Sequence, residues 1–443
     1  MKLKVKKLPI LLPLLLVAAI LITTAVMARL SRDSAAAHTD LGQKYLNNMD
    51  YTGAITEFLN GLSIDPTAQD ARLGLAEAYA ASGSPELVSE ILEPLTQAQS
   101  PDAYRLLIES QRDGDPHQAL LAAQELVEHT DLDEDYTIRD ELLGQVLQEA
   151  HSYAVGTDQR LILDGGALLS AGSNTFGQLG TEQGLATESV QNQFRSAQFS
   201  GQAARVYCAG RTSYVVDQSG NLWAAGENRW GQFGVDYTSA DPQSGWTEIM
   251  DSGDVATVAG NVGQLYVLKT DGSLWYAGQG GVLEFRQIRD FGQVIAVESM
   301  GQRTAVLMAN GLLYVSEASD PLSWTRQASD VKLFSFGGDG LIWVTQENQI
   351  CFWNLGLQVP DTWVQDDQGV TPDVTVRDIA ADSSGLLLLD TAGQLHRLYN
   401  GQIYQTDNTA ENIYSVGGTA VVEHADGTVM LWDLSKPNPT AAA

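Results

Sequence analysis

Two glycine-rich stretches carry the strongest candidate chemistry in this sequence. Residues 168–180 read LLSAGSNTFGQLG and residues 222–234 read LWAAGENRWGQFG. A phosphate-binding loop has the pattern GxxxxGK[ST], in which backbone amides surround the phosphates while the lysine and the hydroxyl reach the outer phosphate and Mg²⁺. Gln178 and Leu179 stand where that lysine and hydroxyl are required, and the second copy differs in the same way. The repeated residues are turn formers and apolar strand residues, so the pattern predicts a repeating architecture and no nucleotide site.

Three aspartates have the spacing that opens a calcium-binding loop. Asp131, Asp133 and Asp135 alternate along the chain. Tyr136, however, occupies the position of the obligatory glycine, and Leu142 occupies that of the bidentate glutamate. The coordination sphere would be incomplete. The pattern therefore predicts an acidic helix start, and we expect no metal site.

The histidines form no catalytic or zinc-binding pattern. None of the six belongs to an HExxH motif or pairs with cysteine at zinc spacing, and the sequence has no GxSxG elbow. His396 and His424 fall in predicted strands or hairpins, where a hydrogen-bonded structural role is expected. We therefore predict no catalytic residue, no cofactor and no enzymatic activity.

Charge excludes nucleic acid as a partner. The 443 residues carry a formal charge of −30, and the 19 basic and 54 acidic residues after position 33 give −35. Binding to nucleic acid requires a basic face that displaces phosphate counterions, and no Lys/Arg cluster follows residue 33. Strong acidity favours solubility and cationic or neutral partners.

The N-terminus predicts a membrane anchor. Residues 8–28 contain no charge and, as a helix, would span about 31 Å, close to the ~30 Å hydrocarbon layer. Four lysines precede this run, so the positive-inside rule predicts a cytoplasmic N-terminus, a single pass through the cell membrane and an extracytoplasmic remainder. A cleaved signal peptide is the alternative. Cys208 and Cys351 would then lie in an oxidising compartment, but both fall in separate strand-like runs, and we expect two buried, unreactive thiols.

Residues 34–150 show the periodicity of helices with few β-branched runs. A first unit of small and aromatic residues ends at a proline and is followed 34 residues later by a second, and a weaker third begins near Leu106. The first two comprise Leu41, Gly42, Tyr45, Ala54, Phe58 and Pro66, then Leu75, Ala76, Tyr79, Leu92, Leu95 and Pro101. Residues 134–150 are expected to cap the array.

This segment, over residues 35–131, resembles the tetratricopeptide repeat family. The resemblance implies a concave groove that accepts a peptide or a helix. Mapped onto this sequence, the groove lining comprises Thr39, Gln43, Asn47, Leu73, Glu77 and Ala81. It contains no Lys or Arg, so no residue there could clamp a carboxylate. A rigid spacer that separates the next domain from the membrane is the alternative.

From residue 152 the hydrophobic period changes to two and apolar runs alternate with turn residues. Seven turn positions each separate two such runs, and these are Gly166, Gly220, Gly272, Gly311, Asn348, Gly393 and Gly427. The pattern predicts seven β-hairpins whose turn residue has a positive φ angle. Trp246, Phe285, Trp324 and Trp363 recur at steps of 39 residues, and Tyr404 follows 41 later, which sets the period.

Seven sheets of three or four strands cannot cover their own faces, whereas a ring of sheets removes all but short edges. We therefore predict a seven-bladed β-propeller over residues 151–434. Its glycine motifs in residues 152–282 resemble the regulator of chromosome condensation repeat, whose blades end in the same GxNxxGQLG pattern. Founding members of that family catalyse guanine-nucleotide exchange and bind chromatin, and others hold protein partners on a propeller face. Because this chain has a predicted anchor and an acidic surface without a basic tail, exchange activity is not expected.

Loops on a rigid scaffold are the expected recognition surface. The loops that follow the inner strands contain Arg211, Gln264, Arg303, Asp339 and Ser384. Trp246, Trp324 and Trp363 are expected on edge strands, where they either seal blades or present a binding rim.

The sequence thus predicts four segments. They are a cytoplasmic basic segment with a transmembrane signal anchor (1–33), a tetratricopeptide-repeat domain (34–150), a seven-bladed propeller (151–434) and a flexible tail (435–443). The predicted function is a membrane-anchored, extracytoplasmic scaffold of bacterial cell-surface type that binds protein or peptide partners. A glycan or cell-wall binding propeller and a propeller enzyme acting on extracellular polymers remain the alternatives.

Overall fold

The structure is a computed structural model. It describes residues 34–114, 116–130, 132–146, 151–164, 166–181, 190–236, 238, 245–288, 291–317, 319–337, 340–354, 372–382, 384–399, 402–434, 436 and 440–441. The predicted anchor, residues 1–33, lies outside this set. Within the described residues, no helix combines the length and the apolar character needed to cross a membrane.

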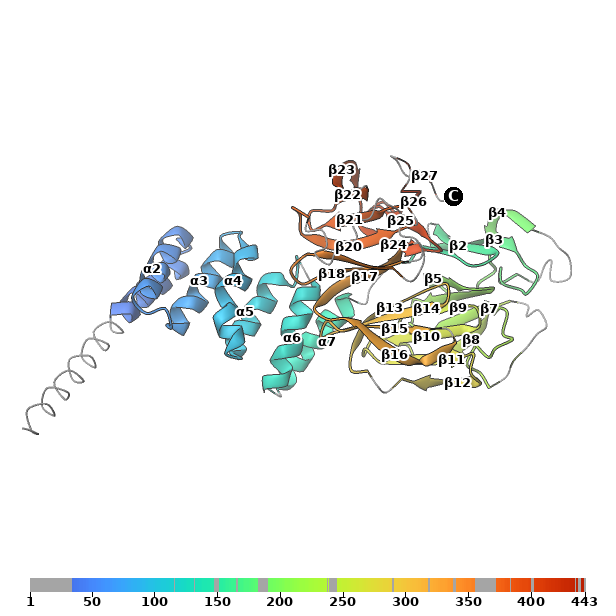
Figure 1. The fold of residues 1–443 in the computed structure, drawn as a ribbon, viewed down its shortest axis with the longest axis horizontal. Coiled ribbons are helices and arrows are strands. Elements are labelled where there is room, and N and C mark those ends of the chain that lie inside the picture. The colour runs from blue at the N-terminus through green and yellow to red at the C-terminus, as the bar shows by residue number, and fades with distance from the viewer. Residues whose placement is uncertain are drawn as a thin grey trace, which may run out of the picture. The chain divides into compact units, whose positions relative to one another are not determined.

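Helices make up the described chain before residue 147. They are a first helix over residues 34–47, α2 (Tyr51–Ile64), α3 (Gln69–Ala81), the 3₁₀ helix η1 (Pro85–Leu87), α4 (Val88–Gln97), α5 (Pro101–Gln111), α6 (Pro116–Thr130) and α7 (Asp133–Val146). Helices α2 to α5 lie side by side in chain order, drawn in blue in Figure 1. Helices adjacent in the chain thus pack against one another, which agrees with the helical repeats predicted from the 34-residue period.

In the first repeats, two glycines on neighbouring helices pack against the same phenyl ring. Phe58 is fully buried, and a Cβ atom placed on Gly42 or Gly74 would lie 2.8 or 2.3 Å from its ring. Only glycine therefore allows both neighbouring helices this close to the phenyl ring. Helix α2 begins where the Asp50 carboxylate accepts a hydrogen bond from the Gly53 amide at 3.0 Å.

Two compact units divide the chain. The first contains the residues up to 113 together with 125–135, and the second contains 114–124 together with 136–443. The sequence placed all of residues 134–150 in the helical domain as a cap. In the structure most of α7 instead groups with the strands that follow it.

The second unit contains seven antiparallel sheets. Their strands, in chain order, are β1 (Tyr153–Val155), β2 (Gln159–Asp164), β3 (Ala167–Ser173) and β4 (Val190–Ser196); β5 (Ala203–Ala209), β6 (Thr212–Asp217), β7 (Leu222–Gly226) and β8 (Thr247–Met250); β9 (Val255–Asn261), β10 (Gln264–Lys269), β11 (Leu274–Gly278) and β12 (Val282–Gln287); β13 (Val294–Met300), β14 (Arg303–Met308), β15 (Leu313–Glu317) and β16 (Asp320–Ala328); β17 (Val331–Gly337), β18 (Gly340–Thr345) and β19 (Ile350–Asn354); β20 (Val376–Ala381), β21 (Leu386–Asp390), β22 (Gln394–Tyr399) and β23 (Gln402–Thr409); and β24 (Asn412–Val416), β25 (Thr419–Glu423), β26 (Val429–Trp432) and β27 (Thr440–Ala441). Each sheet pairs its strands in sequence order.

All seven predicted hairpins are confirmed. The turn residue of each has a positive φ angle, namely +85° at Gly166, +80° at Gly220, +79° at Gly272, +76° at Gly311, +64° at Asn348, +80° at Gly393 and +81° at Gly427. Asparagine at the fifth turn is consistent with this rule, since it tolerates the left-handed conformation better than other non-glycine residues.

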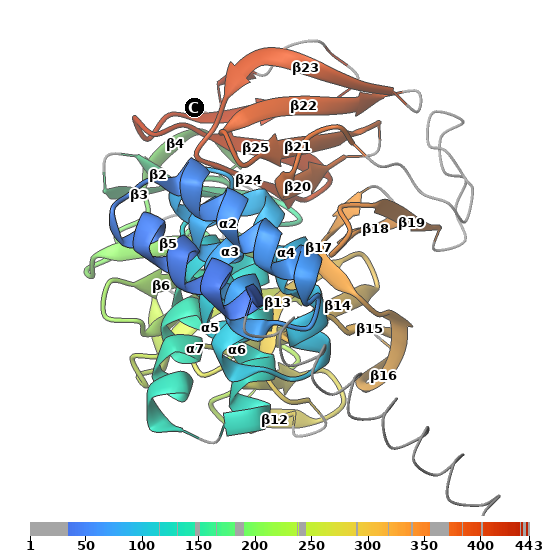
Figure 2. The ribbon, with the colours of Figure 1, turned by 90° about the vertical axis from the view of Figure 1, so that its left-hand side faces the viewer.

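The sheets form a closed ring of seven blades. The first strand of each sheet contacts the first strand of the next, in the order β1, β5, β9, β13, β17, β20, β24, and β24 contacts β1. Figure 2 shows the sheets following one another around the view, with β20–β23 at the top, β17–β19 on the right and β5 and β6 on the left. The seven-bladed propeller predicted from the period of 39 residues is therefore confirmed.

Apolar side chains fill the spaces between neighbouring blades. The run LLLLD in β21 is buried throughout, because its alternating side chains enter the clusters on both faces of the blade. Tyr153 and Ile162 of the first blade share a cluster with Tyr414 and Val421 of the last. The ring thus closes through the same kind of packing that joins blades adjacent in sequence.

The C-terminal segment was predicted to be a flexible tail over 435–443. Thr440 and Ala441 instead form β27, whose residues pair with Leu431 and Met430 of β26. The chain end therefore supplies the outer strand of the last blade. Sequence could not show this, because two residues are too few for a hydrophobic period.

Candidate binding face and channel of the propeller

Residues within each glycine motif form hydrogen bonds with one another, which explains why the motif contains Asn, Gln and Gly. In the first copy the Asn174 Oδ1 accepts the Leu179 amide at 2.9 Å, the Gln178 Oε1 accepts the Phe176 amide at 2.8 Å, and the Gly180 amide donates to the Gly177 carbonyl at 2.9 Å. The second copy repeats the side-chain pattern through Asn228 and Gln232. The backbone amides that would surround a phosphate already donate hydrogen bonds within the motif. These hydrogen bonds support the prediction that the glycine motifs belong to a repeating architecture and form no nucleotide site.

The last glycine of each motif receives an aromatic ring from the next blade. A Cβ atom on Gly180 would lie 2.2 Å from Trp246 Nε1, and one on Gly234 would lie 2.4 Å from the ring of Phe285. Trp246 Nε1 also donates to the Ala197 carbonyl of the preceding blade at 2.9 Å. These contacts hold successive blades together.

Trp324 has a similar position. Its ring lies edge-on to Tyr266, with centroids 5.7 Å apart, and to Phe291, with centroids 5.1 Å apart. Trp246 and Trp324 are both half-buried in blade interfaces, which gives the two indoles a packing role. Trp363 lies outside the described residues. A role for these three residues in partner binding stays a prediction.

We call one side of the ring the loop face and define it by the loops that follow the first and third strands of each sheet. Strand direction places Arg211, Gln264, Arg303 and Ser384 on this face, as predicted. Asp339 lies outside the described residues.

The two arginines predicted on the loop face, Arg211 and Arg303, have matching environments. The Arg211 guanidinium lies over the Phe176 ring at 5.1 Å and its Nε is 3.1 Å from an Asp158 carboxylate oxygen. The Arg303 guanidinium lies 6.0 Å from the centre of the Trp353 ring, and its Nε is 2.7 Å from Glu317. Each arginine therefore lies close to an aromatic ring and is paired with a carboxylate.

The other two predicted residues are less available. Gln264 is 1% exposed, and a contact between its side chain and a partner stays a prediction. Gln264 is the first residue of β10, and its Nε2 donates to the Gln279 Oε1 at 3.4 Å. Ser384 is half-buried, and its amide donates to Asp382 at 2.6 Å.

The sequence analysis missed two exposed apolar residues on the loop face. Trp230 is 44% and Val262 is 57% exposed. They come from adjacent blades, and Trp230 lies against the loop between β9 and β10 that contains Val262, since a Cβ atom on Gly263 would lie 2.4 Å from the Trp230 ring. A signal was present, since Trp230 occupies in the second glycine motif the position that Phe176 has in the first.

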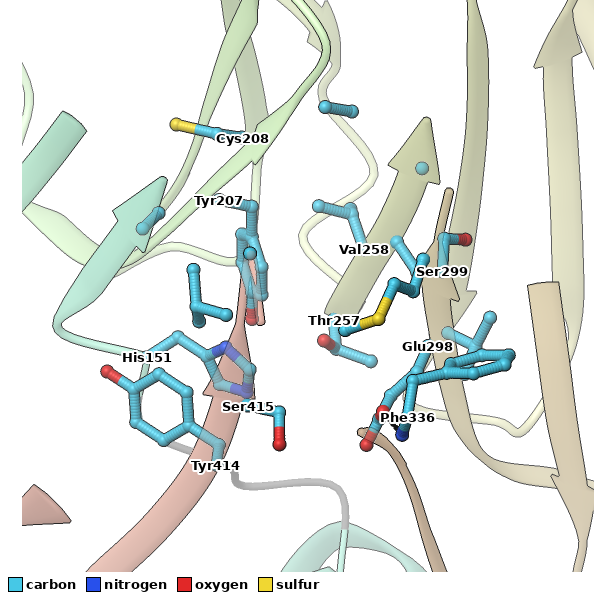
Figure 3. Close-up of a pocket in the computed structure, with 18 of the residues that line it drawn as sticks. His151, Tyr207, Cys208, Thr257, Val258, Glu298, Ser299, Phe336, Tyr414 and Ser415 are labelled. Carbon is cyan, nitrogen blue, oxygen red and sulfur yellow. Dashed lines mark hydrogen bonds between the residues drawn. The ribbon is translucent and has the colours of Figure 1, made fainter. Parts of the chain in front are cut away.

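The first strands of all seven sheets surround a channel of about 370 Å³. Figure 3 shows His151, Tyr207 and Tyr414 on one wall, with Glu298 and Phe336 across the space. His151 stacks on Tyr414, with ring centroids 4.3 Å apart, and lies 5.0 Å from the Tyr207 ring. These rings form an aromatic wall.

A carboxylate behind the aromatic wall joins the first and last blades. Glu423 Oε1 accepts hydrogen bonds from the Tyr414 hydroxyl at 2.7 Å and from the Ser152 amide at 2.9 Å. The Tyr153 amide donates to the Tyr414 hydroxyl at 3.0 Å. Burial, followed by the negative charge of Glu423, raises the pKa of Tyr414 well above its ordinary value, so the phenol stays protonated and donates.

Both cysteines are free, and both are half-buried, whereas full burial was expected. Cys208 lies in β5 and Cys351 in β19, and neither forms a disulfide. Burial raises the pKa of Cys208 to about 12 and also raises that of Cys351. Neither thiol is activated as a nucleophile.

In the helical unit, Gln43, Asn47 and Glu77 are exposed, and Gln43 donates to Asn47 at 3.3 Å. The aspartate motif has a structural role, because the fully buried Asp135 carboxylate receives two hydrogen bonds from Arg105, at 3.1 and 2.8 Å. A guanidinium therefore holds the carboxylate that a calcium loop would need. Among the described residues no group of three or more His, Cys, Asp or Glu side chains could hold a metal ion.

Comparison with known proteins supports the two repeat architectures. The tetratricopeptide repeat family profile matches residues 45–110. Prp20p from Saccharomyces cerevisiae is similar in structure, with a TM-score of 0.52, 14% identity, and coverage of 69% of this chain and 89% of that chain. The same yeast protein bound to Kap60 has a TM-score of 0.49 and 14% identity, with coverage of 64% of this chain and 80% of that chain. Human WBSCR16 has a TM-score of 0.48 and 16% identity, with coverage of 61% of this chain and 85% of that chain. No curated protein matches the sequence.

At these identities the likeness is one of fold. The chain combines tetratricopeptide repeats with a propeller like that of the yeast protein. Both architectures generally bind protein partners and typically act as scaffolds.

Proposed function

We propose that this protein is a membrane-anchored, extracytoplasmic scaffold whose loop face binds a protein partner. One observation carries the proposal. Trp230 and Val262 form an exposed apolar pair on the loop face, on the same face as the arginine–aromatic stack of Arg211 and Phe176.

The chemistry of this pair fits a protein interface. Tryptophan and arginine are the residues most enriched among those that dominate binding energy, and a few well-placed side chains usually suffice. Their positions are fixed, because Trp230 rests on the backbone at Gly263 and Arg211 is bonded to Asp158. Little conformational entropy would be lost on binding.

The glycan and enzyme alternatives receive less support. A glycan site would use a rim of exposed aromatic rings for stacking, but Trp246 and Trp324, two of the three candidate rim residues, pack between blades. A propeller enzyme would require an activated group on an accessible surface, and the raised pKa values of Cys208 and Cys351 argue against either thiol.

The partner-binding test uses two pairs of substitutions in the full-length chain. Trp230→Ala with Val262→Ala removes the loop-face pair, and Tyr404→Ala with Val190→Ala removes an aromatic residue and a valine of similar exposure from outer strands. Proteins cross-linked in intact cells are then identified by mass spectrometry. We expect at least one partner to be lost from the first variant and kept by the second. Equal partner sets in both variants, with both proteins folded, would contradict the proposal.

The anchor and the location are part of the proposal and rest on residues 1–33. Carbonate extraction of cell membranes should leave the full-length protein in the membrane and release a chain without those residues. Protease added to intact spheroplasts should degrade the propeller. Release of the full chain by carbonate, or protection of the propeller, would contradict this part.

A further inference from the structure

We propose that the partner bound at the loop face contributes an acidic side chain, from Asp or Glu, next to an apolar one. The site consists of Arg211, Arg229, Trp230 and Val262, which we call the loop-face patch. This inference rests on the proposed function, because it names the chemistry of the protein that binds there.

The two arginines of the loop-face patch are joined through Glu227. Its amide donates to the Arg211 carbonyl at 3.1 Å, and its Oε1 lies 3.4 Å from the Arg229 Nε. Trp230 follows Arg229 directly in the chain. Glu227 itself is 6% exposed, so a buried carboxylate connects the two guanidinium groups beneath the surface.

Val262 completes the patch from the neighbouring blade. A Cβ atom on Gly263, the next residue, would lie 2.4 Å from the Trp230 ring. A Cβ atom on Gly210 would lie 3.1 Å from the Val262 Cα. Gly210 precedes Arg211 in the loop between β5 and β6, so the series of contacts returns to the first arginine. The loop-face patch is therefore one continuous surface on two adjacent blades.

The exposed part of the patch offers hydrogen-bond donors beside apolar area. The side chains of Arg211 and Arg229 are 43% and 52% exposed, and Trp230 and Val262 are exposed as well. In both arginines the nitrogen nearest the paired carboxylate is Nε, and a guanidinium carries further N–H groups on its Nη atoms. These groups can donate to a carboxylate of a partner, while the indole and the valine cover an apolar side chain next to it.

Charge distinguishes the loop-face patch from the chain as a whole. The chain carries a formal charge of −30, whereas Arg211 and Arg229 balance the carboxylates of Asp158 and Glu227, with which they pair. A basic side chain would meet two guanidinium groups at this surface, and a carboxylate would meet hydrogen-bond donors. Local charge therefore favours an acidic segment here, although the acidity of the whole chain favours cationic partners elsewhere on the surface.

The loops that hold these donors are ordered by their own hydrogen bonds. Arg211 Nε donates to Asp158 at 3.1 Å. Gln232 Oε1 accepts the Trp230 amide at 3.0 Å, and Gln232 Nε2 donates to the Glu227 carbonyl at 2.7 Å. Little conformational freedom would be lost on binding, which favours affinity for a short acidic segment.

The test is a calorimetric titration of the full-length protein in detergent with peptides that differ chiefly in charge. They are the N-acetylated, C-amidated sequences Glu-Leu-Phe-Glu, Gln-Leu-Phe-Gln and Lys-Leu-Phe-Lys. We expect the glutamate peptide to bind about 5-fold more tightly than the glutamine peptide, and the lysine peptide to bind most weakly. Acetyl-Gln-Leu-Phe-Gln with a free C-terminal carboxylate shows whether a main-chain carboxylate is preferred to a side-chain one.

Three results with the wild-type protein would overturn the proposal, whether or not any variant folds. The first is equal or weaker binding of the glutamate peptide compared with the glutamine or the lysine peptide. The second is the absence of glutamate-peptide binding at millimolar concentrations. The third is tighter binding of the peptide with the free C-terminus than of the glutamate peptide.

Variants locate the binding on the loop-face patch. Arg211→Gln with Arg229→Gln should reduce the affinity for the glutamate peptide to that for the glutamine peptide. Arg195→Gln with Arg326→Gln makes the same change of charge at exposed positions of the outer strands β4 and β16, and it should leave the affinity unchanged. Equal affinities in the two double variants would place the binding elsewhere and overturn the assignment.

Cross-linking in intact cells separates this inference from the proposed function. A partner lost from the variant with Trp230→Ala and Val262→Ala should also be lost from the variant with Arg211→Gln and Arg229→Gln. A partner lost from the first variant and kept by the second would overturn the acidic segment and leave the proposed function standing. Retention of every partner by both variants would overturn both.

Discussion

Replacement of Glu423 by alanine should destabilise the propeller selectively. Glu423 is 6% exposed and its Oε1 receives two hydrogen bonds, from the Tyr414 hydroxyl and the Ser152 amide, at the junction of the last blade with the first. Hydrogen bonds to a charged group contribute about 1.5–3 kcal/mol each. Removal of the carboxylate also relieves its desolvation, so we take the lower end of their sum and expect a loss of about 3 kcal/mol.

The distribution of tryptophan makes the assay specific. All nine tryptophans lie between residues 223 and 432, in the second unit, and the helices up to residue 113 contain none. Urea unfolding followed by tryptophan fluorescence therefore reports the propeller, while circular dichroism at the helical band reports mainly the repeats. Glu423→Ala should move the fluorescence transition and leave the helical one in place.

Two further variants show whether the loss of stability comes from the missing hydrogen bonds or from the removal of any glutamate. Glu423→Gln retains an acceptor and should lose about half as much free energy of unfolding. The exposed Glu248→Ala should change it by no more than about 0.5 kcal/mol. If Glu423→Ala behaved like Glu248→Ala, the inference that this junction closes the ring would be refuted.

Three other predictions concern the glycine turns and the helical unit. Gly172→Ala should cost more than about 3 kcal/mol in the fluorescence assay, because its Cβ would lie 2.1 Å from a backbone oxygen, whereas Gly166→Ala, with open space around it, should cost about 1 kcal/mol. Phe58→Ala should cost about 3–5 kcal/mol in the helical transition alone, since the ring is fully buried. For Asp135, burial opposes ionisation, but hydrogen bonds and the charge of Arg105 outweigh it and lower the pKa of the carboxyl. Its contribution to stability is therefore complete above the unfolded pKa of about 4 and is lost as pH falls through the lower folded pKa, and Arg105→Ala should remove most of this pH dependence in helical melts.

The hairpins could be predicted from the sequence because each depends on a few adjacent residues at its turn. A turn residue with positive φ needs glycine or asparagine, and seven such residues at a regular period revealed seven blades. The glycine at position 42 was equally informative, since it lies against Phe58.

The candidate site was harder to predict because exposure depends on distant residues. Gln264 is the first residue of strand β10 and is 1% exposed, and the Trp246 indole lies against Gly180 of the neighbouring blade. Trp230, in contrast, lies against Gly263 of the neighbouring blade and is 44% exposed. The channel could not be predicted at all, since its wall joins His151 to Tyr414, 263 positions apart in the chain.

Closure of the ring, on which both binding proposals depend, can be measured with one engineered disulfide. A Cβ atom on Gly417 of the last blade would lie 3.5 Å from that of Val155 in the first, within the range of disulfides. Val155→Cys with Gly417→Cys should lose two titratable thiols on mild oxidation and remain a monomer on a non-reducing gel. The control, Val155→Cys with Gly301→Cys in the fourth blade, should retain them. Free thiols in the first pair, or equal cross-linking in both, would contradict a closed seven-bladed ring.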